Sequence, residues 1–560
     1  MNYLNLGLIG PTFLFLVPFV AGAVDALPTT RLLPVVTESP SGELLSAEER
    51  STPFLAHLGD LSKFGYVEEE YEMSGIGNIY DYVDNDAQSS EIAISESGVP
   101  FVTRMLVRRP ANPAAFNGTV YIEILNSTAH WDDDPIWRMS YPSFVKAGSA
   151  YVGITSDPLT VDFLRNYWGA PEFFAGRRRY ELAPRNRDRY QNLNMDRFGQ
   201  VWDILSQAAA LLKDDDNPDN PMRGFGVERI IQTGYSQSGG FEKTYANSMH
   251  SRDVEEYGFA VYDGYFIGAH GFSAKKINPP LPDEGDDYLG VFDVRRLVDV
   301  PVPAIRFQTE TEILNWFAAH TGRQVETGEP NGPKIRTYEM AGGVHVDLQL
   351  ETTGLLIRQR DLGFSIEPAE CPLPVIPIST SYIQSALLRA IEIWVRDGIE
   401  PPPSSLIELI TNENMGKFVV FDENGNATGG LRSPQIEVPL GQYIANPATL
   451  LNNCFLNGGF IAFDEERFRQ LYPTDHDYLL AVDREISRAV ADGIVLAEDA
   501  DSLRQDMLAD AGISDIGGGG DSDNFFGCTL GRNGRPDPTF PALVLIALAY
   551  LTRRKWLRVH

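Results

Sequence analysis

The feature that most constrains the fold of this 560-residue chain is a short turn, residues 234–239, between two segments of different pattern. Residues 229–233 are rich in β-branched side chains and are typical of a strand, whereas residues 239–250 can form a helix. A sharp turn from strand to helix needs small residues two positions before and after its central residue. Ser236 is flanked in this way, so the turn predicts a serine hydroxyl that stands clear at the N-terminus of a helix.

The same turn has a second interpretation, centred on Ser238. In that frame Ser236 and Gly240 are the flanking residues, and the larger of them lies on the strand side. With Ser236 at the centre, Gly234 is on the strand side, although serine rather than the usual glycine then stands on the helix side. We favour Ser236, because the strand side is where a bulky neighbour is least tolerated.

Other segments alternate between strand-like and helix-like patterns. Residues 119–125 and 150–155 are short runs of β-branched and aromatic residues separated by a helical pattern, which predicts adjacent strands of one sheet. Residues 196–212 have helical periodicity ahead of the strand that leads into the turn. This alternation is typical of an α/β domain. With 43% hydrophobic residues, the chain can bury a large core.

Charge and cysteine content exclude some classes of partner. The chain has 46 basic and 77 acidic residues and a net charge of −31, which argues against nucleic acid, since phosphate binding needs concentrated positive charge. The three cysteines show no CxxC or Cys/His ligand spacing, so no structural zinc is expected. We expect neither a metal nor another cofactor. In an oxidising compartment Cys371 and Cys454 are candidates for a disulfide.

A serine hydroxyl needs a histidine base and an acid to become nucleophilic. With the chain order nucleophile, acid, histidine, the best base is His345, because it follows a strand and a loop of small residues at 338–344. His270 is the strongest competitor, since it follows an expected strand at 259–262. His250, on the helix that leaves the turn, is interpreted as structural.

The acid should follow the strand that precedes the histidine. Residues 302–308 form that predicted strand, and Glu312 stands a few positions beyond its end. Glu310 and Asp263 remain alternative acids. Glutamate suits the role, because the acid has only to accept the imidazole N–H and stabilise the imidazolium.

Two N–H groups should stabilise the oxyanion of an acyl-transfer intermediate. One is expected from the residue after the nucleophile, Gln237. The second should come from the loop after strand 119–125, so Asn126 or Ser127 is its expected source.

Residues of about 65–510 resemble the large, mostly uncharacterised bacterial "alpha/beta hydrolase domain" family. The resemblance is carried by segments at 104–110, 116–126, 234–239, 262–264, 309–312, 341–345, 394–398, 401–402, 429–434 and 499–500. It implies the α/β-hydrolase fold, with a mostly parallel central sheet flanked by helices, and a triad of Ser236, Glu312 and His345. It implies hydrolase chemistry but no settled substrate.

From these patterns we expect a hydrolase domain over residues 40–515. Residues 160–194, rich in aromatic and arginine side chains, are expected to be a lid-like insertion. Residues 376–510 are expected to form a C-terminal α+β extension.

Both ends of the chain are expected to be targeting segments. Residues 1–23 have the pattern of a signal peptide, with cleavage expected after Ala23 or Ala26. Residues 516–560 combine a Gly-rich linker, Cys528, a short apolar run and a basic cluster, and they resemble the bacterial C-terminal sorting tails of the JDVT-like type. That resemblance implies cleavage near Cys528 by an intramembrane sorting protease, with the cysteine as lipidation point.

Together these patterns predict an exported bacterial serine hydrolase that is associated with a membrane or cell surface on the periplasmic or extracellular side. The expected partners are a small-molecule or lipid-like ester as substrate, and signal peptidase and the sorting protease for processing. Two alternatives remain: an amidase or peptidase of the same fold, and a non-catalytic, surface-anchored binding scaffold, since a fold does not fix a function.

Overall fold

The computed structural model describes residues 26–84, 89–175, 178–270, 274–280, 292–293, 295, 297, 300–314, 334–364, 371–411, 417–445 and 454–513. The expected signal peptide and the expected tail with Cys528 lie outside these residues. Within the described segments, no helix has both the length and the hydropathy needed to span a membrane.

A large sheet forms the centre of the molecule, in the spatial order β1-β2-β3-β5-β4-β8-β9-β12-β13. Its strands are β1 (Thr29–Leu32), β2 (Tyr66–Tyr82), β3 (Ile92–Pro110), β4 (Thr119–Ile124), β5 (Ala150–Ile154), β8 (Arg229–Tyr235), β9 (Gly264–Gly268), β12 (Ala304–Thr309) and β13 (Ile335–Met340). The strands from β5 to β13 pair in parallel, whereas β1, β2, β3 and β5 pair antiparallel. The sheet is therefore mostly parallel, as predicted, and the two strands expected near residues 119–125 and 150–155 are neighbours in it.

Helices cover both faces of this sheet. They are α1 (Pro135–Ala147), α2 (Pro158–Asp162), α3 (Val201–Lys213), α4 (Gln237–Thr244), α5 (His250–Tyr257), α6 (Glu310–Leu314), α7 (Leu348–Asp361) and α8 (Ser381–Asp397). Side chains of β4 alternate between two cores: Val120 and Ile122 pack with residues of α3 and α4, and Tyr121 packs with residues of α1 and α8. This alternation explains why β4 is buried along its whole length.

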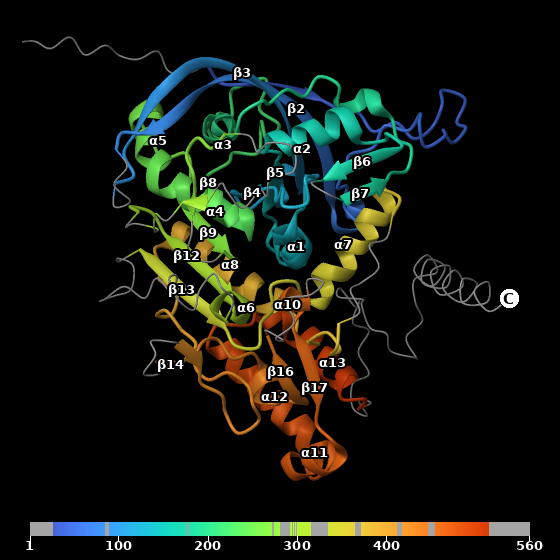
Figure 1. Cartoon of the computed structure of the whole chain (residues 1–560), viewed down its shortest axis with the longest axis vertical. Coiled ribbons are helices and arrows are strands. Elements are labelled where there is room, and N and C mark those ends of the chain that lie inside the picture. Colours follow the sequence, from blue (N-terminus) through green and yellow to red (C-terminus); the bar gives the residue numbers. More distant parts are fainter. Residues whose placement is uncertain are drawn as a thin grey trace, which may run out of the picture.

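The C-terminal part of the chain adds small elements to one end of the molecule. They are β14 (Leu409–Thr411), β15 (Lys417–Val419), α9 (Pro434–Glu437), β16 (Gly441–Ile444), α10 (Cys454–Asn457), β17 (Gly459–Ala462), α11 (Glu465–Leu471), α12 (Asp475–Ala491) and α13 (Ala500–Asp510). Apolar residues of α12 and α13 share the core that contains α8. The long pair β2 and β3 arches over the opposite end (Figure 1).

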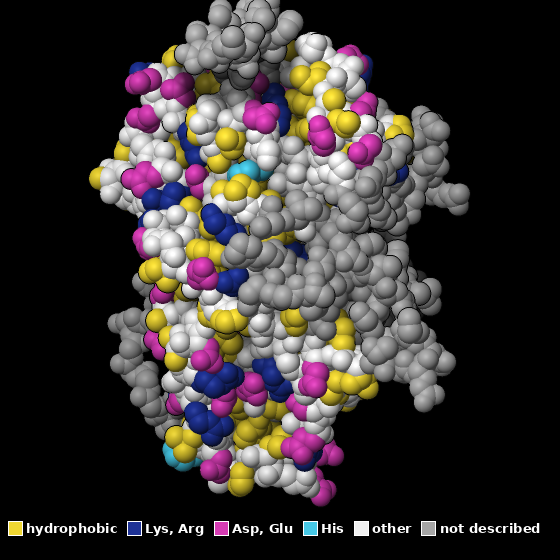
Figure 2. Space-filling model, turned by 90° about the vertical axis from the view of Figure 1, so that its left-hand side faces the viewer, with side chains coloured by type: hydrophobic (Ala, Val, Ile, Leu, Met, Phe, Trp, Pro, Cys, Tyr) yellow, Lys and Arg dark blue, Asp and Glu magenta, His cyan; other side chains and the backbone are white. Residues whose placement is uncertain are grey.

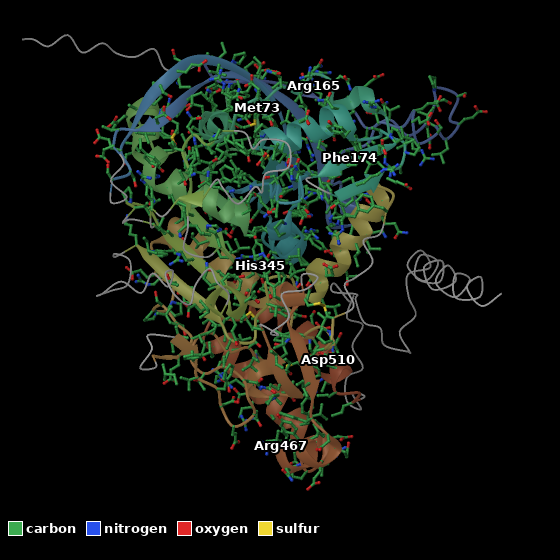
Figure 3. The ribbon with its side chains drawn as sticks, viewed as in Figure 1. Met73, Arg165, Phe174, His345, Arg467 and Asp510 are labelled. Carbon is green, nitrogen blue, oxygen red and sulfur yellow. A yellow bond between two sulfur atoms is a disulfide. The ribbon has the colours of Figure 1, made fainter. Side chains whose placement is uncertain are left out.

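The expected lid-like insertion contains an antiparallel pair, β6 (Glu172–Ala175) and β7 (Arg178–Glu181). Phe163 and Phe173, from this region, are buried, with ring centroids 4.9 Å apart. Phe174 on β6 is 57% exposed and lies at the side of the molecule (Figure 3). The insertion is thus packed on the domain through one face and presents an aromatic side chain to solvent on the other.

One sequence expectation about the sheet was wrong. Residues 259–262 are not a strand. Strand β9 begins at Gly264, two residues after the end of the expected strand. A Cβ atom on Gly264 would lie 2.8 Å from a methyl group of Val395 in α8. The glycine lets α8 pack closely on the sheet, so a residue that marks a turn in the sequence lies inside a strand.

On the face that Figure 2 shows, acidic and basic side chains are interspersed among apolar ones. Many of the charges in the described part of the chain are paired across elements. An example is the fully buried Arg104, which contacts Glu70 at 2.9 Å and Asp132 at 3.0 Å.

Candidate active site

The predicted turn connects β8 to α4. Ser236 has a positive φ of 58° with ψ of −121°, a conformation that residues with a side chain rarely adopt and that is found at strained functional turns. Its N–H donates to the Gly268 carbonyl at 2.9 Å. A Cβ atom on Gly234 would lie 2.7 Å from the backbone of Ser238, so glycine is required on the strand side. The chain passes from strand to helix through a tight elbow with Ser236 at its apex.

The two serines of this turn have different environments. The Ser238 side chain is fully buried, and its hydroxyl donates to the Tyr235 carbonyl at 2.9 Å and accepts from the Tyr235 N–H at 3.0 Å. Ser236 is partly exposed. The Ser238 hydroxyl therefore stabilises the turn itself, and this geometry favours the frame centred on Ser236.

His345 and Glu312 are in direct contact. Nδ1 of His345 lies 2.6 Å from Oε1 of Glu312. An ionised carboxylate only accepts hydrogen bonds, so Nδ1–H is the donor, and Nε2 of the neutral ring is left with a lone pair. The Glu312 side chain is 6% exposed and that of His345 15%. The pair is thus shielded from water, while the imidazole still reaches the surface.

Neighbouring groups fix the orientation of Glu312. Its second oxygen, Oε2, accepts from both the N–H and the hydroxyl of Thr309, each at 2.6 Å. Thr309 ends β12 and Glu312 lies three residues later in α6, which matches the Thr-x-x-Glu pattern of a capped helix start. Sequence reasoning missed Thr309, and this spacing was the signal that could have identified it.

The backbone of His345 is held from two sides. Its N–H donates to the Thr311 hydroxyl at 3.3 Å, and its carbonyl accepts from the Tyr235 hydroxyl at 2.8 Å. The rings of Tyr235 and His345 have centroids 5.5 Å apart. Because Tyr235 precedes Ser236 in the chain, these contacts connect the loop that carries His345 to the elbow that carries Ser236.

Ser236, Glu312 and His345 all follow parallel strands of the sheet. Ser236 follows β8, Glu312 lies in the helix after β12, and His345 lies five residues beyond β13. The carboxyl ends of parallel strands lie at one edge of a sheet, which is where ligands bind in open α/β folds. His345 lies between the arched end of the molecule and its C-terminal end (Figure 3).

The alternative acids have other partners. Glu310 accepts from the Gly342 N–H at 2.7 Å, and burial raises the pKa of its carboxyl to about 7. Asp263 accepts from the Ile230 N–H at 2.7 Å and pairs with Lys213 at 2.8 Å. Since Asp263 directly precedes β9, it lies at the amino ends of the strands, away from the elbow. Of the three candidates, Glu312 is the one placed against His345.

The other histidines considered as bases are packed elsewhere. His250 Nδ1 lies 2.8 Å from the Tyr265 hydroxyl, and burial lowers the pKa of the ring to about 4. His270 is buried against α4, where a Cβ atom on Gly240 would meet its ring at 2.9 Å. Its position explains why glycine stands at residue 240.

Asn126 and Ser127, the two expected sources of the second oxyanion donor, differ in what their N–H groups contact. The Asn126 N–H donates to the Asp133 carbonyl at 2.8 Å, while its side-chain amide donates to the Tyr235 carbonyl at 2.9 Å. The Asn126 side chain therefore connects its loop to the elbow, and its N–H is engaged by Asp133 within that loop. The Ser127 N–H makes a longer contact, 3.3 Å, to the side-chain oxygen of Gln237.

Ser127 is further anchored by its hydroxyl. That group donates to Asp157 at 2.7 Å and accepts from the Gln237 side-chain amide at 2.9 Å. The loop after β4 is thus crosslinked to the first residue of α4, whose own N–H is the other expected donor. The longer contact of the Ser127 N–H, compared with that of the Asn126 N–H, favours Ser127 as the proposed second oxyanion donor.

Cys371 and Cys454 form a disulfide, with Cα atoms 5.6 Å apart. Within the ranges that the structure describes, no cluster of three or more His, Cys, Asp or Glu side chains could hold a metal ion.

Solved structures that match the chain at low identity include esterases and a hydrolase. They include the carboxylesterase Cest-2923 from Lactobacillus plantarum WCFS1, with 12% identity and a TM-score of 0.24 over 42% of this chain and 72% of that chain. A putative dienelactone hydrolase from Klebsiella pneumoniae subsp. pneumoniae MGH 78578 has 12% identity and a TM-score of 0.22 over 44% and 75%. A thermostable esterase from Pseudomonas putida ECU1011 has 11% identity and a TM-score of 0.24 over 46% and 67%.

No curated protein matches the sequence. A family model does: the one described as "Alpha/beta hydrolase domain" matches residues 37–505. The match spans most of the chain and includes the elbow, the Glu312 helix and the His345 loop, and so the chain belongs to the alpha/beta hydrolase domain family.

Proposed function

We propose that the protein is a serine hydrolase that cleaves carboxylic esters, with Ser236 as nucleophile, His345 as general base and Glu312 as the acid that orients the base. The observation that carries the proposal is the 2.6 Å contact between His345 Nδ1 and Glu312 Oε1. It leaves Nε2 as the basic nitrogen of a ring whose backbone is joined to the residue before Ser236.

In the first half-reaction, His345 Nε2 takes the proton of the Ser236 hydroxyl while Oγ attacks the ester carbonyl. The N–H groups of Gln237 and Ser127 stabilise the oxyanion. The tetrahedral intermediate then expels the alcohol, which receives the proton from the imidazolium. Glu312 stays ionised and stabilises that imidazolium.

In the second half-reaction, water attacks the acyl group on Ser236, with His345 again removing a proton. The acid product leaves and the serine hydroxyl is restored. The insertion that starts at residue 160 is proposed as a lid, and its exposed Phe174 on β6 would suit a small-molecule or lipid-like ester. The proposed substrate class is therefore an ester with an apolar part.

A fluorophosphonate probe tests the proposal, because it forms a stable bond only with an activated serine. We expect covalent labelling at Ser236, identified by peptide mass mapping, together with turnover of p-nitrophenyl esters. Faster turnover of p-nitroanilides than of esters would instead identify an amidase. A folded protein that neither reacts with the probe nor turns over either substrate would refute the proposal and favour a binding scaffold.

We also propose that the protein is exported and then retained at a membrane through its tail. The support is the apolar segment before Ala23 and the Cys528-containing tail with its short apolar run and basic end. Signal peptidase and an intramembrane sorting protease are the proposed processing partners.

A further inference from the structure

The residue after His345 is held by a part of the chain far away in sequence. The Val346 N–H donates to the Leu456 carbonyl at 2.9 Å. The Val346 carbonyl accepts from the Asn457 side-chain amide at 3.1 Å. Both backbone polar groups of Val346 are thus satisfied by the short helix α10.

Helix α10 depends on other segments for its position. It has four residues, and a helix of one turn has little stability of its own in water. Its first residue, Cys454, is 1% exposed and is bonded to Cys371, 83 residues earlier. The disulfide therefore fixes the N-terminal end of α10, two and three residues before Leu456 and Asn457.

Close packing supports the same contact. Gly458 ends α10 with φ of +67°, and a Cβ atom there would lie 2.6 Å from Val344 and 2.7 Å from Ile376. Val344 precedes His345, and Ile376 belongs to the segment that follows Cys371. The Phe460 N–H donates to the Pro374 carbonyl at 2.9 Å. The segments that follow Cys371 and Cys454 are therefore in contact with each other, next to the loop that carries His345.

We propose that α10, fixed by the Cys371–Cys454 disulfide, is a positioning element for the general base, with Asn457 as its positioning side chain, and that oxidation of these cysteines is required for full activity. This inference rests on the proposed role of His345. The contacts of its own backbone with Thr311 and Tyr235 do not involve the disulfide. Reduction should therefore misplace the imidazole rather than release it.

Dithiothreitol provides the direct test, applied to the full mature protein. One thiolate of the reductant attacks the disulfide and expels the first cysteine sulfur, and the second attacks the resulting mixed disulfide and expels the other. The reductant becomes a cyclic disulfide and both cysteines become thiols. Cys371 is partly exposed, which gives the reductant access. We expect kcat for a p-nitrophenyl ester to fall by about tenfold to hundredfold, with KM changed by less than about twofold, and reoxidation to restore kcat.

The Cys371→Ser/Cys454→Ser double variant is the control for the reductant. It should have the low kcat of the reduced protein and should not respond to dithiothreitol. Full kcat in wild-type protein whose Cys371 and Cys454 are shown to be reduced by mass mapping would overturn the proposal. Labelling of oxidised protein by fluorophosphonate is measured first, so absence of labelling is a failure of the proposed function and not of this inference.

Asn457→Ala tests the positioning contact without touching the disulfide, and it decides the matter if reduction unfolds the protein. We expect kcat to fall about fivefold to tenfold at unchanged KM, with the thermal unfolding midpoint within a few degrees of wild type. Asn424→Ala is the matched control, since Asn424 accepts from Arg467 on α11 at 2.6 Å, and its kcat should equal that of wild type. Unchanged kcat in Asn457→Ala would overturn the proposal.

Discussion

The hydroxyl of Tyr235 donates to the carbonyl of His345 at 2.8 Å, and the two rings pack with centroids 5.5 Å apart. Tyr235 directly precedes Ser236 in the elbow. The backbone of the proposed base is therefore attached to the residue that sets the direction of the proposed nucleophile. Such attachment holds reacting groups in place before substrate binds, which is one of the largest sources of rate enhancement in enzymes.

Tyr235→Phe should separate this attachment from packing, because the ring remains and only the hydroxyl is lost. We expect kcat to fall about tenfold, since the His345 carbonyl loses its partner, and stability to fall by about 1 kcal/mol for one hydrogen bond. Steady-state kinetics and urea denaturation measure the two effects. A normal kcat with lowered stability would show that the hydrogen bond serves the fold alone.

Substitution of the two elbow serines should give opposite results. Ser236→Ala is expected to abolish fluorophosphonate labelling and to lower kcat on the order of 10⁶-fold, as for other triad serines. Ser238→Ala should keep labelling and lose about 1 kcal/mol of stability, because its hydroxyl bonds the backbone of Tyr235. Labelling that survives in Ser236→Ala and disappears in Ser238→Ala would place the nucleophile two residues later.

The two glutamates of α6 provide a second contrast. Glu312→Gln should lower kcat by about 10³- to 10⁴-fold, since an amide in place of the carboxylate favours the wrong imidazole tautomer. Glu310→Gln should change kcat by less than about tenfold, because Glu310 accepts from Gly342 and not from His345. The comparison uses kcat for one ester at one pH, and a larger loss in Glu310→Gln would move the acid by two residues.

Burial of Glu310 should also affect how stability varies with pH. Its folded pKa of about 7 lies above the ordinary value of 4.5, so between these pH values the folded protein holds a proton that the unfolded chain has released. Stability must then fall as pH rises from 4.5 to 7, by about 3 kcal/mol for this group. Glu310→Gln lacks this loss, so its unfolding free energy relative to wild type should increase from pH 5 to pH 8 in urea denaturation. A constant difference would mean that Glu310 is ionised throughout.

Local sequence patterns were sufficient to predict much of the fold and the contact between two of the candidate site residues. The strands near residues 119–125 and 150–155 were predictable because fully buried parallel strands are short apolar runs rich in β-branched residues. The elbow was predictable because Gly234 is required by a steric contact within five residues of the chain. Chain order led to Glu312 and His345, since each follows a recognisable strand; the two are in contact, and their catalytic roles stay predictions.

Features that depend on distant contacts were not predictable. The start of β9 was misplaced because Gly264 is required by Val395 of α8, more than a hundred residues away. The N–H of Asn126 is engaged by Asp133, and the choice of Ser127 as the proposed oxyanion donor rests on this contact of the folded loop. The contacts of α10 with Val346 join residues more than one hundred positions apart, and no local pattern indicates them.

The two ends of the chain, which lie outside the described residues, are expected to be processed. We expect the mature protein to lack residues 1–23 or 1–26 and residues 529–560, and to carry a lipid on Cys528. The apolar run of residues 540–551 is shorter than the roughly 20 residues of a spanning helix, which favours a sorting signal over a permanent anchor. The basic residues 553–555 that follow it would stay in the cytoplasm and keep Cys528 near the outer interface.

Intact-mass spectrometry of protein extracted with detergent checks this prediction. One acyl chain binds a membrane only marginally, so stable retention requires a second chain or another contact, and the measured mass should show how many chains are attached. Cys528→Ser is the matched variant, and it should lose both the lipid mass and retention in the membrane fraction while keeping ester turnover. A mature mass that still includes residues 529–560 would reduce the tail to an ordinary anchor. Unchanged mass and retention in Cys528→Ser would exclude the lipid, because no other cysteine of the chain is available once Cys371 and Cys454 are paired.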